Sequence, residues 1–341
     1  MLFIIATLFI SFIIRLIIYK MDMEQFTDHI DNIEIEPLSK NKLDLYSYNF
    51  QTIEQFKPSS CSIQPYGEGY IMNIRYINYS FNEQGIIYYH NPDKVGKTKN
   101  VSVFLDDSYK PISKLIPMKE VYTAYQSDYT GLEDIRLFYH QNKLKCIASC
   151  GNITNDGKIV ITIGDYNIQN KLINNLKIIK SPYNSNMEKN WIFVNDKFLF
   201  KLDESKNKMN FIYVWSPLKI GYIDKESELH IYKEYNVPNI FKRFRGSTIV
   251  IEYNGFLWSL VHYLKTPNPR VYYHCIVKLE YGTLKPIAIS NPFVFLNKGI
   301  EYCIGFEIKN DIASFIFSSN DSNPSLIQKH MDTFILNDIN N

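Results

Sequence analysis

Four short clusters of charged and polar residues recur along the chain at nearly even spacing. They occupy residues 133–136 (Glu-Asp-Ile-Arg), 188–191 (Glu-Lys-Asn-Trp), 243–247 (Arg-Phe-Arg-Gly-Ser) and 299–302 (Gly-Ile-Glu-Tyr). Adjacent carboxyl groups suit proton transfer, because a neighbouring carboxylate raises the pKa of an acid. Arginine and lysine suit an anionic substrate group. The clusters repeat about every 56 residues, and periods near this length are typical of propeller blades.

Short strand-like runs fill the intervals between the clusters. Residues 143–148, 158–163 and 209–215 are rich in β-branched and aromatic side chains, and residues 247–253 and 256–261 flank an Asn-Gly turn that predicts a hairpin. Long amphipathic helix patterns are almost absent after residue 55. The pattern predicts an all-β fold, and the even period favours a propeller over a sandwich.

An earlier blade fits residues 59–110, which makes the prediction a five-bladed β-propeller over residues 59–338. The first strand of each blade lines the central channel. Polar groups at the start of these strands therefore meet at one mouth of the channel, where a concave polar site is the first hypothesis for an active site. The alternative is that these charges only pair with one another and close the ring.

Composition limits the classes of function. The chain has 341 residues, of which 45% are hydrophobic, and its net charge of +2 gives no electrostatic basis for nucleic-acid binding. Its five cysteines do not form a paired metal-ligand spacing. The sequence therefore predicts no metal, no cofactor and no nucleic-acid partner.

The N-terminal segment has a different character. Residues 2–19 are apolar apart from Thr7, Ser11 and Arg15, and their length is close to what a bilayer-spanning helix needs. We expect residues 1–20 to form an uncleaved hydrophobic anchor helix and residues 21–58 to form a stalk. The expected localisation is a single-pass membrane anchor. The side of the membrane stays open, because Arg15 and Lys20 favour a cytoplasmic domain whereas four Asn-x-Ser/Thr sequons matter only in a lumen.

Several motifs, taken in order, resemble a known family. They are residues 70–79 (Tyr-Ile-Met-Asn-Ile-Arg-Tyr-Ile-Asn-Tyr), the Glu-Asp-Ile-Arg cluster, residues 188–191 with the strand 211–217, residues 245–247 with His262 and residues 272–274, and residues 315–321. Over roughly residues 59–336 the chain resembles the five-bladed propellers related to glycoside hydrolase family 130, the β-mannoside phosphorylases. It is most similar to a subgroup found beside glycosyltransferases of bacteria and giant viruses.

The resemblance implies a chemistry. It implies that Asp134 is the general acid and that inorganic phosphate or a sugar phosphate is the co-substrate, with an oligosaccharide, first of all a mannoside, as ligand. The catalytic residues are then Asp134 and Glu133. The residues expected to bind substrate are Arg136, Glu188, Lys189, Asn190, Arg243, Arg245, His262, Tyr273, Glu301 and Asp321.

One position departs from the family motif. Ile135 stands where the Glu-Asp-Pro-Arg motif has proline. The first blade also offers no clear second carboxylate for activating water, since Glu68 lies in a turn. A two-carboxylate hydrolase is therefore disfavoured relative to a phosphorylase-like or transferase-like enzyme. Two functions remain open: an enzyme acting on glycosidic bonds, and a non-catalytic glycan-binding propeller associated with glycan assembly.

Overall fold

The structure is a computed structural model that describes residues 21–339, apart from residues 22, 41–44, 83–85, 184 and 268. Strands dominate the described part, which also contains a short α-helix at residues 23–31. Four 3-10 helices lie in the connections: η2 (Asp196–Leu199), η3 (Asp203–Ser205), η4 (Asn239–Arg243) and η5 (Met331–Thr333). The expectation of an all-β fold is confirmed.

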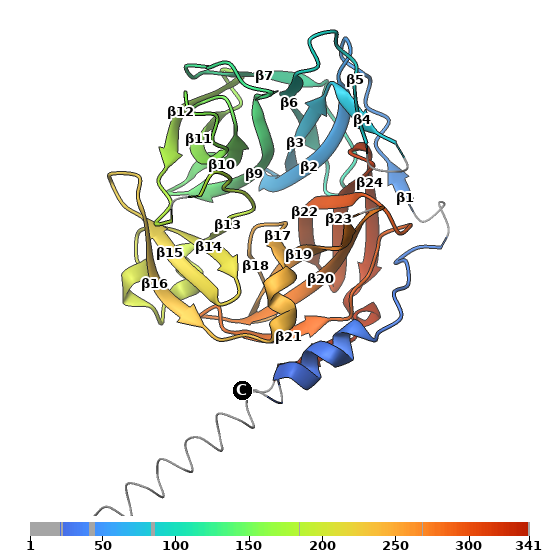
Figure 1. Ribbon diagram of the computed structural model, residues 1–341, viewed down its shortest axis with the longest axis vertical. Helices are drawn as coiled ribbons and strands as arrows, with labels where there is room; N and C mark the ends of the chain where they lie inside the picture. Colours follow the sequence, from blue (N-terminus) through green and yellow to red (C-terminus); the bar gives the residue numbers. More distant parts are fainter. Residues whose placement is uncertain are drawn as a thin grey trace, which may run out of the picture.

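The strands form sheets arranged in a ring, as Figure 1 shows. One continuous sheet holds β2 (Lys57–Tyr66), β3 (Gly69–Ile77), β6 (Gly96–Leu105), β7 (Ile116–Glu120), β12 (Leu172–Ile179), β11 (Val160–Asn167), β10 (Lys143–Cys150) and β9 (Leu132–His140), with β8 (Tyr129–Thr130) beside β6. It consists of two antiparallel halves joined at their outer strands by a parallel pairing of β7 with β12. The next sheet holds β13 (Ile192–Val194), β14 (Met209–Trp215), β15 (Leu218–Ile223) and β16 (Leu229–Tyr235).

Two further sheets complete the ring. One holds β17 (Arg245–Gly246), β18 (Ile251–Tyr253), β19 (Phe256–Pro267), β20 (Arg270–Glu280), β21 (Pro286–Ser290) and β25 (Leu336–Asp338). The other holds β22 (Glu301–Lys309), β23 (Ile312–Ser319), β24 (Ser322–His330) and β1 (Leu45–Ser47). A separate hairpin pairs β4 (Tyr79–Phe81) with β5 (Ile87–Tyr89). The result is a propeller-like fold.

Packing between neighbouring sheets explains the apolar strands. In β3, every residue from Tyr70 to Ile77 is buried, because neighbouring sheets cover both faces of the strand. Of the innermost strands, β2 contacts both β9 and β22. These strands all begin on the same side of the ring, so residues near their starts are brought together.

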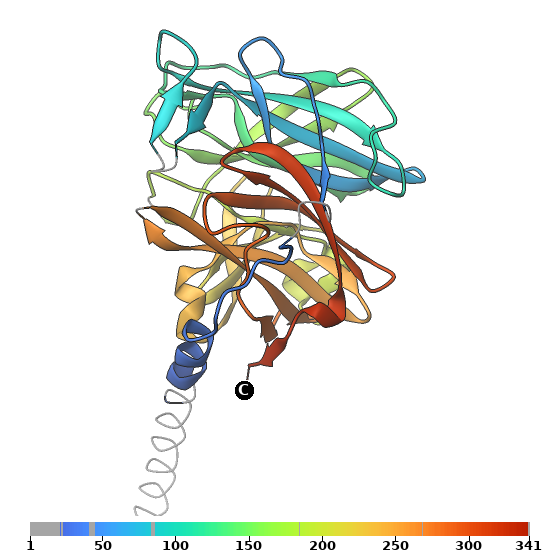
Figure 2. The ribbon, with the colours of Figure 1, turned by 90° about the vertical axis from the view of Figure 1, so that its right-hand side faces the viewer.

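The segment predicted as a stalk packs against the propeller. Ile30, in the helix at residues 23–31, is buried in the core between the β13–β16 sheet and the sheet that contains β19 and β20. Figure 2 shows this helix beside η4, where Thr27 accepts a hydrogen bond from the backbone N–H of Ile240. Strand β1 then adds to β24 as an outer strand. Apolar side chains at Phe26, Ile30 and Ile33 gain burial by docking, which explains why the segment does not stand apart.

The predicted membrane-anchored localisation is corrected here. Among the described residues, no helix has both the length and the apolar character needed to cross a bilayer. The apolar run at residues 2–19, on which that prediction rested, lies outside the described residues.

Candidate active site

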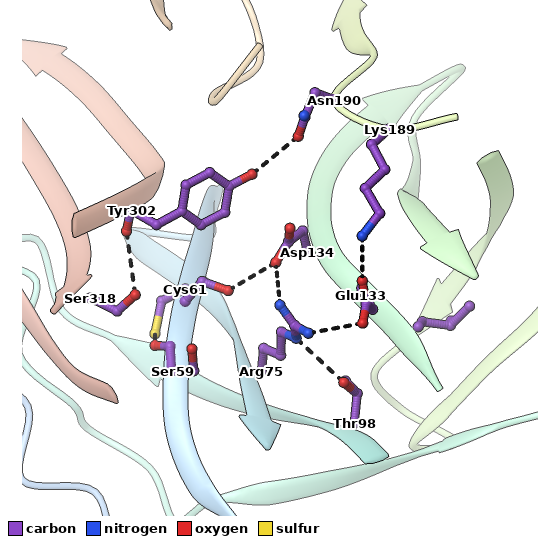
Figure 3. Close-up of polar contacts among 12 residues, drawn as sticks. Ser59, Cys61, Arg75, Thr98, Glu133, Asp134, Lys189, Asn190, Tyr302 and Ser318 are labelled. Carbon is purple, nitrogen blue, oxygen red and sulfur yellow. Dashed lines mark hydrogen bonds and ion pairs between the residues drawn. The ribbon is translucent and has the colours of Figure 1, made fainter. Parts of the chain in front are cut away.

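A buried arginine organises the mouth of the channel. Arg75, on β3, donates one hydrogen bond to Oδ1 of Asp134 at 2.8 Å and another to Oε1 of Glu133 at 3.1 Å. The same guanidinium donates to the hydroxyls of Tyr79 at 2.9 Å and Thr98 at 3.3 Å. Figure 3 shows these carboxylates converging on Arg75. The single positive charge of Arg75 therefore faces the carboxylates of Glu133 and Asp134, the two residues predicted to be catalytic.

Glu133 has a second cationic partner. Nζ of Lys189 lies 3.0 Å from Oε2 of Glu133, so this carboxylate bridges Arg75 and Lys189. Lys189 comes from the segment before β13 and Glu133 from β9. The structure thus brings the first two sequence clusters together at one mouth, as their spacing predicted.

Local irregularities in two strands aim the side chains. In the pairing of β9 with β10, Asp134 and Ile135 together face the single residue Ala148, which makes a β-bulge. Asp134 has φ of 52°, a left-handed conformation that aspartate tolerates better than most residues. Ile135 itself is buried in the core. The bulge turns the carboxylate toward Arg75, and it lies within the motif where Ile135 replaces proline.

A matching bulge occurs in β2. Ser59 and Ser60 together face Arg75, because Pro58 pairs with Tyr76 and Cys61 pairs with Ile74. Ser60 donates a hydrogen bond to Oδ1 of Asp134 at 3.3 Å. Asp134 is therefore held from two strands of another sheet half, which fixes its position before any ligand arrives.

The charge environment separates the pKa values of two carboxyl groups. Burial alone raises the pKa of Asp134, but Arg75, Arg136 and Lys189 outweigh it and lower that pKa below its usual value. At Asp321, burial and the carboxylates of Asp134 and Glu133 outweigh the nearby arginines and raise the pKa to about 6. The expectation of a raised pKa at Asp134 is wrong, because the positive charges of Arg75, Arg136 and Lys189 act on that carboxylate and outweigh its burial.

Asp321 approaches the cluster from a tight turn. Asn320 and Asp321 connect β23 to β24, and both have positive φ, as in the two-residue hairpin turns that asparagine and aspartate favour. The carboxyl group is half-buried. Its raised pKa means that Asp321 holds a proton for part of the time near neutral pH.

Arg136 joins neighbouring sheets. Its guanidinium donates to the backbone carbonyls of Gly246 at 3.2 Å and Ser247, and to the hydroxyl of Tyr302 at 3.0 Å. Asn190 completes this network, because its side-chain oxygen accepts from both Arg136 at 3.4 Å and Tyr302 at 3.3 Å. Arg136 and Asn190 therefore hold the strands at the mouth in place, and the hydrogen bonds described here are made to other protein groups.

His262 lies at the mouth as a neutral imidazole. Its Nδ1 shares a hydrogen bond of 2.8 Å with the hydroxyl of Ser247, and the ring of Tyr302 meets its ring edge-on. Burial, together with the positive charges of Arg136 and Arg245, lowers the pKa of His262 to about 3. The imidazole can exchange hydrogen bonds with a ligand, but it adds no positive charge for anion binding.

A basic pocket of about 290 Å³ adjoins the cluster. Its charged lining comprises Lys189, Lys242, Arg245 and Glu188. Glu188 is committed to the protein, since its carboxylate accepts from the indole of Trp191 at 3.0 Å and the hydroxyl of Tyr213 at 3.1 Å. Arg245 is exposed, and its guanidinium donates a hydrogen bond to the carbonyl of Phe244 at 3.0 Å. The pocket therefore carries a net positive charge beside Asp134.

Three predicted binding residues lie elsewhere. Arg243 pairs on the outside with Asp31 of the N-terminal helix, with Nη2 2.9 Å from Oδ2. Tyr273 is buried in the core, where its ring meets Tyr263 edge-on. Glu301 accepts backbone hydrogen bonds from residues 295–297, and burial raises its pKa to about 7. Each of these side chains has a structural partner away from the Arg75 cluster.

Several residues of the site were not predicted from the sequence. Arg75 lies within a mostly apolar strand. A buried arginine needs an anionic or hydrogen-bonding partner, so the sequence alone could have indicated that Arg75 pairs with a carboxylate. At this part of the site the sequence predicted Tyr273, but the side chain at the site is that of Tyr272. Alternate strand residues point to opposite faces, and Tyr272 is the one beside His262. Tyr302 belongs to the cluster at residues 299–302, from which Glu301 was the predicted binding residue, and Ser60 carries no comparable sequence signal.

Solved structures of carbohydrate-active proteins share this fold. β-1,2-mannobiose phosphorylase from Listeria innocua, in complex with β-1,2-mannobiose, superposes with a TM-score of 0.56 at 10% identity, over 85% of this chain and 97% of that one. A putative glycosidase from Bacteroides thetaiotaomicron gives 0.55 at 9% identity, over 86% and 95%. A member of the GH130 family of mannoside phosphorylases, which contains glycoside hydrolases that target β-1,2 mannosidic linkages in Candida mannan, gives 0.52 at 8% identity, over 81% and 85%.

These structural similarities establish the fold. Any statement about the chemistry has to come from the residues of the site. No protein-family model and no curated protein sequence matches the chain. The coarse resemblance stated from the motifs is confirmed at the level of the fold, which is that of the propellers of glycoside hydrolase family 130 and related glycosidases.

Proposed function

We propose that this chain is a carbohydrate-active enzyme that acts on glycosidic bonds of mannosides or related sugars, with inorganic phosphate or a sugar phosphate as the second substrate. The observation that carries the proposal is the cluster in which Arg75 holds Glu133 and Asp134 beside a basic pocket. The pKa values of Asp134 and Asp321 are shifted in opposite directions there. Two carboxyl groups whose surroundings push their pKa values apart are a recurring basis for acid and base roles.

The proposal divides the roles between these two groups. Asp321 holds the transferable proton and protonates the leaving oxygen, because its pKa of about 6 leaves part of the population protonated near neutral pH. Asp134 stays ionised and accepts hydrogen bonds from sugar hydroxyls through the oxygen that Arg75 does not hold. This assignment revises the expectation that Asp134 is the general acid.

The basic pocket supplies the place for the second substrate. Lys189 joins it to the carboxylate cluster, and Lys242 and Arg245 add positive charge. An arginine fork suits a phosphate oxyanion, and a volume of about 290 Å³ accommodates a phosphate or a small phosphorylated group. Phosphate bound here lies beside the carboxylates that would act on the sugar.

The decisive experiment is a screen of the full chain for phosphorolysis and its reverse. Oligomannosides are incubated with inorganic phosphate, and sugar 1-phosphates with acceptor sugars, while phosphate is quantified in each case. Asp321→Asn and Asp134→Asn serve as paired variants. Turnover that is lost in Asp321→Asn supports the assignment. Full turnover in Asp321→Asn with loss in Asp134→Asn returns the acid role to Asp134.

A non-catalytic glycan-binding propeller is the second candidate. The ion pair between Arg75 and Asp134 favours it, because a mouth whose charges satisfy one another needs no reaction to explain it. Binding of oligosaccharides without turnover in any arm of the screen would support this function over the enzyme.

Two finer points belong to the same proposal. We count the two halves of the β2–β9 sheet as separate blades, and with the three other sheets they make five. The narrower similarity to propellers found beside glycosyltransferases of bacteria and giant viruses stays a prediction from the sequence motifs.

A further inference from the structure

The inner strands connect two chemically different faces of the propeller. β9 carries Glu133 and Asp134 near its start and Tyr139 near its end. β2 carries Ser60, which contacts Asp134, near its start and ends at Tyr66. Five residues along a strand span roughly 16 Å. The ends of these strands therefore open on the face opposite the Arg75 cluster.

That far face carries a pocket of about 460 Å³ between Tyr66 of β2 and the half of the large sheet that contains β9, β10 and β11. Tyr66 and Tyr139 contribute half-buried rings, while Asn142, Asn167 and Gln169 contribute amide groups. Tyr166 lies at its buried base, with its hydroxyl donating to Asn73 at 2.9 Å. The pocket combines aromatic surface with hydrogen-bonding groups of both kinds.

Its walls are fixed by local structure. Gln141 and Asn142 connect β9 to β10 with φ of 49° and 59°, as expected for a two-residue hairpin turn. The ring of Tyr66 packs against Phe104 with centroids 5.4 Å apart. A ligand therefore meets walls that need little reordering, which lowers the entropic cost of binding.

The charges in this pocket select a neutral ligand. Asp165 is compensated, because its carboxylate pairs with Lys145 at 2.6 Å and accepts from the amide of Asn175 at 2.8 Å. Lys143 is exposed at the rim. A neutral molecule with apolar faces and many hydroxyl groups matches both the tyrosine rings and the amides.

We propose that this pocket, lined by Tyr66, Tyr139, Asn142 and Gln169, is a second saccharide-binding site on the face opposite the Arg75 cluster. The proposal rests on the proposed function only in taking a glycan as the ligand class. A sugar held here lies too far from Asp134 to react. The site therefore retains a long glycan, or anchors the protein to one, while another segment occupies the reactive mouth.

The test uses the full chain and two linear probes, mannotetraose and maltotetraose. Calorimetry measures affinity, and hydrogen exchange locates protection. We expect residues 139–144 and 165–169 to gain protection with at least one probe. Tyr139→Ala and Gln169→Ala should each weaken that binding by about tenfold, the scale of one lost stacking or hydrogen-bonding contact. Tyr88→Ala, which removes an exposed tyrosine outside the pocket, should bind as the parent does.

Two results overturn the proposal: protection confined to the peptides around residues 75 and 133–136, or unchanged affinity in both pocket variants. Gln169 is exposed, so Gln169→Ala keeps the test valid if Tyr139→Ala does not fold. The two proposals can be separated. If the pocket residues gain protection from hydrogen exchange but the protein shows no turnover, the second saccharide site is supported and the proposed enzymatic function is contradicted.

Discussion

Nη1 of Arg75 lies 2.8 Å from Oδ1 of Asp134, although the two residues belong to different halves of the large sheet. Both side chains are largely withdrawn from water, with 7% and 17% of their surfaces exposed. A buried pair of this kind costs much more to break than to keep, because removing one partner leaves the other charge uncompensated. The stability of the mouth therefore depends on whether the carboxyl group of Asp134 is ionised.

Arg75→Met should destabilise the protein in a pH-dependent way. At pH 7, where Glu133 and Asp134 are ionised, we expect a loss of about 3–5 kcal/mol in the free energy of unfolding. The lowered pKa of Asp134 means that its pairing stabilises the parent above the unfolded pKa of about 3.9 and that this contribution is lost as pH falls through the folded pKa.

In the variant, burial without a cation raises the carboxyl pKa values instead. The stability difference between parent and variant should therefore shrink as the pH is lowered from 7 toward 4. Denaturant titrations at several pH values measure it. A difference that is small at pH 7, or that does not change with pH, would show that the pair does not set the ionisation of the mouth.

Asp321→Asn should abolish proton donation while preserving the turn between β23 and β24. If the chain turns over a glycoside, kcat should fall by about 10²–10⁴-fold. In the parent, kcat/KM should decline as pH rises above about 6, where Asp321 loses its proton. Asp332→Asn, an exposed aspartate on η5, is the matched control and should keep the parent profile. A parent profile that is flat from pH 5 to pH 8 argues against Asp321 as the acid.

Arg245→Ala should weaken phosphate binding more than it slows chemistry. Removing a charged hydrogen-bond donor from the pocket should raise KM for phosphate or a sugar phosphate by about tenfold, with a smaller change in kcat. Arg243→Ala makes the same change of charge two residues away, where the side chain pairs with Asp31 outside the pocket. Initial-rate kinetics on both variants separate a local contact from a general charge effect, and equal shifts in KM would contradict a specific site.

Gly246→Ala should damage the mouth by crowding. A Cβ atom at Gly246 would collide with the side chain of Ile192 and the carbonyl of Asn190, whereas one at Gly299 meets open space. Overpacking of this kind typically costs about 1–3 kcal/mol. Thermal or chemical unfolding should show this loss for Gly246→Ala and almost none for Gly299→Ala. Equal stability of the two variants would mean that β17 and the segment at Asn190 can separate without cost.

The sequence by itself determined the strand pattern and part of the site. Alternation, turn residues and the repeat period are local properties, so the all-β propeller-like fold could be predicted from them. The convergence of Glu133, Asp134, Lys189 and Asn190 also followed, because each lies at or just before the start of an inner strand. Apolar content predicted burial, but it did not predict that residues 23–31 dock against the ring.

Only the tertiary structure decided which charges pair and which way side chains face. The pKa of a carboxyl group depends on neighbours in space, and Arg75 reaches Glu133 across 58 residues of sequence. Arg243 and Arg245 differ by two positions, yet one pairs with Asp31 while the other lines the basic pocket. Tyr272 and Tyr273 differ by one position and lie on opposite faces of β20. Register and long-range packing set these outcomes, because a one-residue step reverses the face of a strand and composition carries no information about that step.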